Sequence, residues 1–292
     1  PGDPEALNWI AVVERRLGNW DATRVAHEEA LKRDPMSSGT LAYASLTARW
    51  ARDYDLGYRV ATRMAELGEP PAWPALRLTL MRKQLGDLAV LRAWVDSVGP
   101  ALTPSQATQL NAEMAYYGRD YPAALAFTRE WSSSSHWRLG TICRLARDLE
   151  CQRAYGDSIR MTSEASIERL EGSPILRPRR RRALLMGILA RGYALRGDRD
   201  SAISWGRRAV EAYPPAFDVY QGTAVLSYLR DVYVLVGDTE NAVRLLDELL
   251  SRPSLTALND LKLDPFYDSM RSDLGFQALL ERHGGESPNP HN

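Results

Sequence analysis

Apolar residues recur at intervals of three and four along most of the chain, and polar breaks separate the runs. In the stretch "ALLMGILARGYALRGD", Met186, Leu189, Ala190 and Tyr193 follow this spacing. Residues three and four positions apart lie on one face of an α-helix. The pattern therefore predicts a succession of amphipathic helices, each with one face packed against its neighbours.

The polar breaks themselves repeat. "LRGDRDSAI" and "LVGDTENAV" both place a Gly-Asp pair before a helical run, and two weaker copies replace the glycine by arginine. The seven turn positions that we predict are Gly18, Arg52, Gly86, Arg119, Gly156, Gly197 and Gly237. Their spacings of 34, 34, 33, 37, 41 and 40 residues are typical of helix-turn-helix repeat arrays.

The residue types at each break fit a turn between two helices. Glycine adopts positive φ and ends the first helix, and the Asp or Asn that follows caps the second helix. Small side chains five positions after the turn let the two helices approach closely. They are Thr23, Gly57, Ala124, Ala202 and Ala242. Leu91 and Met161 take this position in repeats three and five, which we therefore expect to pack differently.

The period and the turn residues resemble the tetratricopeptide repeat family, most closely in repeats six and seven. This resemblance implies an all-α, right-handed superhelix of about seven helix-turn-helix repeats with a C-terminal capping helix. The tail "LKLDPFYDSMRSDLGFQALLERHG" is similar to the ending of tetratricopeptide regions in bacterial multidomain signalling proteins. Those proteins include serine/threonine kinases, nucleotide cyclases and winged-helix regulators.

We expect residues 1–292 to form a single array. Its parts are repeats one to five at 4–171, repeats six and seven at 178–255, a cap at 256–284 and a disordered tail at 285–292. The two longest intervals predict extended linkers around "GSPILRPRRRR" and "PPAFDVYQG". The arginine run at 177–182 is interpreted as a solvated linker, and contact with an acidic segment or a phosphate is the alternative.

The resemblance also implies that the first helices line a concave groove. Their faces away from the packing positions supply Asn8, Arg15, Arg16, Arg49, Trp50, Trp73, Gln109, Glu113, Tyr116 and Tyr117. Aromatic and arginine side chains are common interface anchors. We therefore expect a non-enzymatic scaffold that binds a peptide or protein segment, and irregular packing of degenerate repeats is the alternative. The family's lysine–asparagine clamp for chaperone C-termini is not reproduced, because Val12 stands at the asparagine position.

The two ends of the array differ. Phe276, Leu279 and Leu280 follow helical spacing, which predicts an amphipathic capping helix around 272–282. The first helix has no such cover, so its apolar edge is a candidate interface. That edge consists of Trp9, Ile10 and Val13. An upstream repeat or domain, or a second copy, is expected to cover it. Self-assembly into an oligomer or filament is therefore the alternative function.

Composition narrows the possible partners. Lys and Arg number 37 and Asp and Glu also 37, so we expect no general attraction to nucleic acid or anionic membrane. No apolar run reaches the roughly 18 residues of a membrane span, and no targeting signal is present, which leaves the bacterial cytoplasm and an extracytoplasmic location both open. Because the chain opens at Pro1 without methionine, it is interpreted as a processed or excised piece.

Candidate chemistry is sparse, and we expect no enzyme activity, metal or cofactor. His27 is predicted to be a packed core residue. The acidic residues Asp260, Asp264, Asp268 and Asp273 lack the spacing of a calcium loop, so capping and turn roles are favoured. If Cys143 and Cys151 share one helix, about 12 Å of rise separates them, which is too far for a disulfide.

Overall fold

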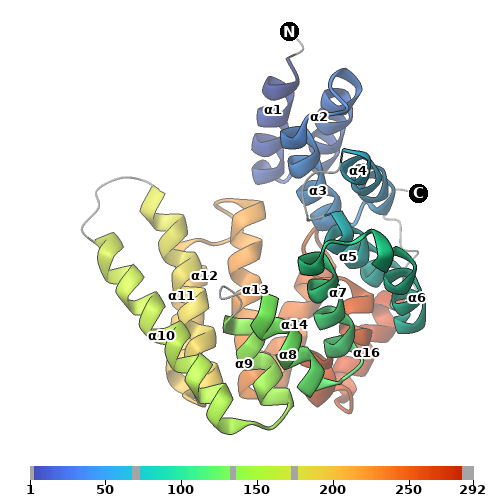
Figure 1. Ribbon diagram of the computed structural model, residues 1–292. Helices are drawn as coiled ribbons and strands as arrows, with labels where there is room; N and C mark the ends of the chain where they lie inside the picture. The colour runs from blue at the N-terminus through green and yellow to red at the C-terminus, as the bar shows by residue number, and fades with distance from the viewer. Residues whose placement is uncertain (1–2, 68–72, 132–135, 172–176, 285–292) are drawn as a thin grey trace.

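The computed structural model describes residues 3–67, 73–131, 136–171 and 177–284, and this part of the chain is helical with no strand (Figure 1). Seven helical hairpins follow one another. They are α1 (Pro4–Leu17) with α2 (Trp20–Arg33), α3 (Ser38–Ala51) with α4 (Tyr54–Glu66), α5 (Trp73–Leu85) with α6 (Leu88–Val98), α7 (Pro104–Tyr117) with α8 (Tyr121–Trp131), α9 (His136–Leu145) with α10 (Leu149–Glu171), α11 (Arg177–Arg196) with α12 (Arg199–Ala212), and α13 (Val219–Val236) with α14 (Thr239–Leu250). A short 3₁₀ turn, η1 (Gly99–Ala101), follows α6.

Each hairpin turns at one residue with positive φ. Among the described residues these are Gly18, Arg52, Gly86, Arg119, Arg147, Gly197 and Gly237. Six of the seven predicted turn positions are thereby confirmed. The acidic residue after the turn caps the second helix, as where Asp53 accepts from Leu56 N at 3.0 Å and Asp198 from Ser201 N at 3.1 Å. Asn19 is the exception, because its amide donates to Glu14 instead, at 2.7 Å.

The turn predicted at Gly156 is wrong. The fifth hairpin turns at Arg147, and Gly156 lies within α10. The sequence "ARDL" carries the same Arg-Asp pair as the second and fourth turns, and Asp148 accepts from Cys151 N at 3.0 Å. Gly156 serves a packing role: a Cβ there would lie 3.1 Å from the carbonyl oxygen of Gly192, so the two glycines let α10 and α11 cross closely.

The exclusion of a disulfide is also wrong. Because the turn lies at Arg147, Cys143 belongs to α9 and Cys151 to α10. Their Cα atoms are 5.7 Å apart and the two residues form a disulfide across the hairpin. The premise that both cysteines share one helix was the source of the error.

The extended linkers predicted before the sixth and seventh hairpins are shorter than expected. Residues 177–182 form the first turns of α11, and Arg179 donates to the carbonyl oxygen of Ala212 at 2.9 Å. Before α13 the chain makes a compact turn at 214–217, where Phe217 N donates to Pro214 O at 3.0 Å. Residues 172–176 and the tail at 285–292 lie outside the described residues.

The first and last hairpins meet. Each hairpin packs on the next, and α1 also packs against α13, at the upper centre of Figure 1. The chain therefore returns to its start. After α14 come α15 (Leu258–Leu263), the 3₁₀ helix η2 (Pro265–Met270) and α16 (Leu274–Gly284). The predicted capping helix is α16, which packs on α14 and buries Phe276 and Leu279.

Residues 250–270, called here the closing segment, were not expected to cross the molecule. In this segment α15 packs on α5, and η2 contacts α9 and α13. The guanidinium of Arg52 donates to the carbonyl oxygens of Leu250, Arg252 and Thr256 at 3.0, 3.1 and 3.2 Å. The side-chain amide of Asn259 donates to Gln84 O at 2.8 Å. The closing segment is thus held by polar contacts to the second and third hairpins.

Two of the turn arginines allow a matched test of this account. Arg147 is exposed and holds a left-handed conformation that disfavours any side chain, so Arg147→Gly should stabilise the fold by about 0.5–1 kcal/mol. Arg52→Gly removes three charge-assisted hydrogen bonds and should destabilise it by about 2–3 kcal/mol. Urea unfolding measures both changes. Equal effects of the two substitutions would contradict the role given to Arg52.

A second prediction concerns His27, which is fully buried beside Thr47 as expected for a core residue. Burial, aided by the charge of Arg15, lowers the pKa of His27 from 6.5 to about 4. The unfolded chain therefore binds the proton more readily than the folded one. Stability should fall as the pH drops from 6.5 to 4, by up to about 3 kcal/mol.

The difference in urea-unfolding free energy between wild type and His27→Gln, taken at each pH, isolates this effect. Carboxylates common to both proteins cancel. The difference should change through the window from pH 6.5 to 4 and be constant above pH 7. If this difference stayed constant over the whole pH range, His27 would not be the cause of the loss of stability at low pH.

Candidate functional site

A cavity of about 400 Å³ lies on the inner side of the hairpins. It is lined by the first helix of hairpins two to seven, from α3 to α13, and by the closing segment. This agrees with the expectation that first helices provide the inner face. The closing segment was not foreseen as the remaining wall.

The cavity gathers positive charge. Its lining includes the cations Arg49, Arg82, Lys83, Arg138, Arg191 and Arg230. Four carboxylates lie in or beside it: Glu113, Asp231, Asp260 and Asp264. Six cations against four carboxylates leave an excess of two positive charges when all are ionised.

Asp260 anchors the closing segment. Its carboxylate pairs with Arg82 Nη1 at 2.5 Å and with Lys83 Nζ at 2.6 Å. Burial alone would raise the pKa of Asp260, but the two cations outweigh it and hold the pKa below its usual value. Burial also lowers the pKa of Lys83 to about 8, although Asp260 opposes this. Lys83 donates in addition to the carbonyl oxygen of Leu255.

Asp264 makes a different kind of contact. The hydroxyl of Tyr116 donates to it at 2.6 Å, and the backbone N–H of Phe266 donates at 2.9 Å. Burial raises the pKa of Asp264 above its ordinary value, against the effect of these hydrogen bonds. Burial also raises the pKa of Tyr116 well above 10. The pKa of Asp264 is therefore shifted in the opposite direction to those of Asp260 and Glu113.

The remaining ion pairs lie on the helices themselves. Arg138 on α9 pairs with Glu113 on α7. Arg191 on α11 pairs with Asp231 on α13, and Arg230 Nε reaches the same carboxylate at 2.6 Å. Two guanidinium groups thus share one carboxylate.

Arg49 has no carboxylate partner among the described residues. Its Nε is buried without a hydrogen-bond partner. Burial lowers the pKa of Arg49, and the hydroxyl of Tyr220 only partly offsets this. A buried donor without a partner costs about 1–3 kcal/mol. Arg49 also lines an adjoining cavity of about 260 Å³ that Gln109 and Glu113 share.

Tyrosine rings hold two of the guanidinium groups in place. Arg191 lies over the ring of Tyr228, 4.0 Å from its centroid, and Arg82 over Tyr117 at 4.9 Å. Stacking of this kind fixes the plane of the guanidinium and leaves its edge free to donate.

The predicted groove residues divide into two groups. Five of them line the two cavities: Arg49, Trp50, Gln109, Glu113 and Tyr117. The others do not: Asn8, Arg15, Arg16, Trp73 and Tyr116.

The second group has packing or surface roles instead. Asn8 is buried and donates to Thr40 at 2.7 Å, and Arg15 lies buried 4.1 Å from the ring centroid of Tyr220. Trp73 packs into the core of the second and third hairpins. Arg16 is half exposed, 3.7 Å from Asp218.

The expectation of an open groove is therefore corrected. Trp50, Tyr116 and Tyr117 are 3, 5 and 1 % exposed, because α13 and the closing segment cover the face on which they lie. Trp50 packs on Tyr220 with ring centroids 4.5 Å apart. Their positions on the inner side were predicted, and their burial was not.

Sequence reasoning missed several cavity residues: Arg82, Lys83, Arg138, Arg191 and Arg230. Two of them carried a weak signal, since Arg82 and Lys83 are adjacent charged residues that follow the apolar pair Leu80 and Met81, just before the turn at Gly86. Asp260 and Asp264 had been noted as an acidic series. Asp264 does cap η2, whereas Asp260 forms the ion pairs described above.

The end face is the second candidate surface, and the predicted exposure is confirmed. Trp9, Ile10 and Val13 on α1 are 56, 50 and 53 % exposed. Leu17, one turn beyond Val13, is 64 % exposed and extends the stripe. We call these four residues the end face. Trp9 also contacts Tyr43 on α3, with ring centroids 6.3 Å apart, and still keeps more than half of its surface exposed.

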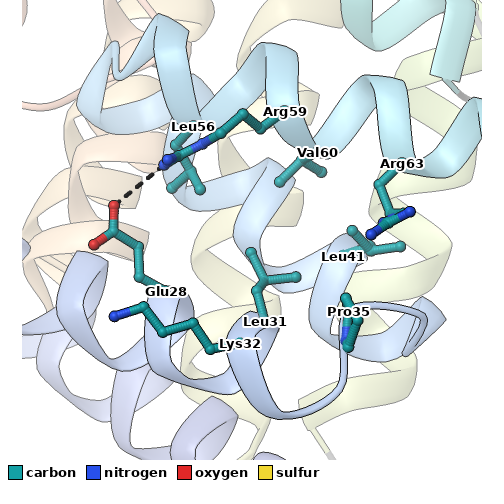
Figure 2. Close-up of a pocket in the computed structure, with 9 residues that line it drawn as sticks. All are labelled: Glu28, Leu31, Lys32, Pro35, Leu41, Leu56, Arg59, Val60 and Arg63. Atoms are coloured by element: carbon teal, nitrogen blue, oxygen red, sulfur yellow. Dashed lines mark hydrogen bonds and ion pairs between the residues drawn. The ribbon is translucent and has the colours of Figure 1, made fainter.

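Figure 2 shows a further, apolar groove of about 290 Å³ between α2, α3 and α4. Leu31 and Val60 lie in its floor, and Arg59 pairs with Glu28 at the edge at 3.2 Å. Its apolar lining belongs largely to the core between the first two hairpins. The groove is therefore part of the packing interface between these helices.

The corrected burial changes the expected effect of a substitution at Trp50. Trp50→Ala should destabilise the fold by about 3–5 kcal/mol, because it leaves a cavity against Tyr220. Trp9→Ala is the matched control and should cost less than about 1 kcal/mol, since Trp9 is exposed. Thermal unfolding measures both. A similar small loss for the two variants would mean that Trp50 is not a core residue.

Sequence comparison identifies no relative of this chain. The chain matches no protein-family model, and no curated protein matches it. None of the helices in the described ranges is long and apolar enough to cross a membrane. The cavity and the end face are therefore the two features of the molecule that point to a function.

Proposed function

We propose that this chain is a non-enzymatic protein-interaction module that associates with a second copy of itself through the end face. The observation that carries the proposal is the stripe formed by Trp9, Ile10, Val13 and Leu17, each at least half exposed. Contiguous apolar side chains of this size on a surface mark interaction sites.

The packing of the other hairpins supports a helical partner. Their first helices pack on the preceding hairpin, as α3 does on α2 and α11 on α10. The end face presents the corresponding surface of α1. An amphipathic helix or another hairpin edge has the shape and the chemistry to cover it.

A second copy suits the face because the stripe itself is formed by four apolar side chains. Arg16, three residues after Val13, pairs with Asp218 at 3.7 Å. Two such faces related by a two-fold axis bring apolar side chains together, and the interface closes as a dimer. Head-to-tail contact with a different surface would instead give an open array.

The inner face is less suitable for a peptide. The closing segment lies across it, and the groove aromatics are buried. We also propose that the hairpins form the superhelix of a tetratricopeptide-like array. The support is the turn chemistry repeated in all seven hairpins, and repeat arrays of this kind are commonly binding scaffolds.

Sedimentation velocity of the isolated chain tests the association. We expect self-association at tens of micromolar. Trp9→Glu or Ile10→Glu should weaken it at least tenfold without loss of helix, because a charge is buried at the interface centre. Circular dichroism checks the helix content.

Met161→Glu is the matched control, since Met161 is 61 % exposed on α10, away from the end face. It should associate like wild type. A wild-type chain that stays monomeric at 50 µM, or a Met161→Glu variant as defective as Trp9→Glu, would contradict the end face as a self-association site.

A further inference from the structure

The inner cavity suggests a binding activity that does not depend on the end face. We propose that it binds a small organic anion, whose phosphate or carboxylate oxygens are received by Arg49 together with Arg191 and Arg230.

The charges around the inner cavity support the binding of an anion. Arg82 and Lys83 share the carboxylate of Asp260, and Arg191 and Arg230 share that of Asp231. Arg49 has no carboxylate partner. The cations outnumber the acids in a partly buried space, where screening by water is reduced. An anion of charge −2 would balance the excess.

Arg49 gives the second argument. Its Nε is buried with no hydrogen-bond partner, yet the residue lines both inner cavities. Buried donors in folded proteins are nearly always satisfied. A guanidinium that is directed into a cavity and lacks an acceptor is suited to receive one from a ligand. Because the Nε itself is enclosed, an oxyanion in the cavity would be received by the terminal Nη groups of Arg49.

The guanidinium groups of Arg191 and Arg230 are held in place before any ligand binds. Arg191 stacks on Tyr228, with 4.0 Å to the ring centroid, and Arg230 lies over Tyr267 at 5.8 Å. Their carboxylate partner, Asp231, fixes them further. Guanidinium groups held in plane present paired donors that match the oxygens of phosphate and carboxylate.

Size and access define the class of ligand. About 400 Å³ lies within the range of small-molecule sites. The closing segment forms one wall of the cavity. Thr79, Ala224 and Ser227 in the lining are partly exposed, so solvent reaches the cavity. We therefore assign the cavity to a compact metabolite-sized anion.

Isothermal titration calorimetry tests the proposal, with pyrophosphate and citrate as separate probes. Sodium chloride keeps the ionic strength constant, because general screening also changes with salt. We expect saturable binding of at least one probe to wild type. The tighter probe tells whether phosphate or carboxylate is preferred. No binding of either probe at 10 mM overturns the proposal.

Arg49→Gln should weaken binding at least tenfold while the protein stays folded, since this substitution breaks no ion pair. Arg92→Gln is the control, because Arg92 is exposed on α6, outside the cavity lining. It should bind like wild type. Arg49→Lys retains the charge without the planar fork and should bind with intermediate affinity. Unchanged affinity in both Arg49 variants overturns the assignment.

Discussion

The ion-paired cluster of Asp260 with Arg82 and Lys83 joins parts of the chain 177–178 residues apart and sets the inner architecture. All three side chains are largely removed from water. Removing one partner of such a buried cluster typically costs about 3–5 kcal/mol, because a charge is then left uncompensated. The position of α15 against α5, and with it the wall of the inner cavity, follows from this contact.

The abundance of cations around the closing segment has a backbone cause. Residues 251–257 between α14 and α15 are not helical, so several of their carbonyl oxygens lack a helical partner. Buried carbonyls require donors. Arg52 donates to two of these oxygens, those of Arg252 and Thr256, and also to that of Leu250 at the end of α14, and Lys83 donates to that of Leu255. Two long cationic side chains, Arg52 at the second turn and Lys83 on α5, thus supply hydrogen bonds to an irregular segment that apolar side chains would leave unpaired.

Local chemistry made much of the fold predictable. A glycine or arginine at positive φ followed by a capping acid depends only on adjacent residues, and six of seven turns were located from it. The seventh was missed because an even period was preferred over the local "ARDL" signal. The same error concealed the Cys143–Cys151 disulfide, since it placed both residues on one helix.

The candidate site was predictable only in part. Helical periodicity places Arg49, Trp50 and Tyr117 on the inner side of their helices, and they do line the cavity. It says nothing of what covers that side. Contacts such as Tyr116 with Asp264 or Arg119 with Asp268 link residues 148 and 149 positions apart and leave no periodic trace in one sequence. Helical periodicity in the sequence therefore could not predict that the groove residues would be buried.

The two candidate surfaces differ in the interaction that drives binding, and this separates their behaviour. The end face is apolar, so association through it depends on buried area and responds little to moderate salt. The cavity is lined by charge and responds to ionic strength. Its cations also hold the closing segment through Asp260. Arg230, one of the three arginines proposed to receive the anion, also donates to Thr256 of the closing segment at 3.2 Å. On our proposal a bound anion would therefore stabilise, by mass action, the arrangement in which these side chains surround it. Ligand binding in the cavity and the position of the closing segment would therefore be linked, whereas the four end-face side chains on α1 take no part in the cavity lining.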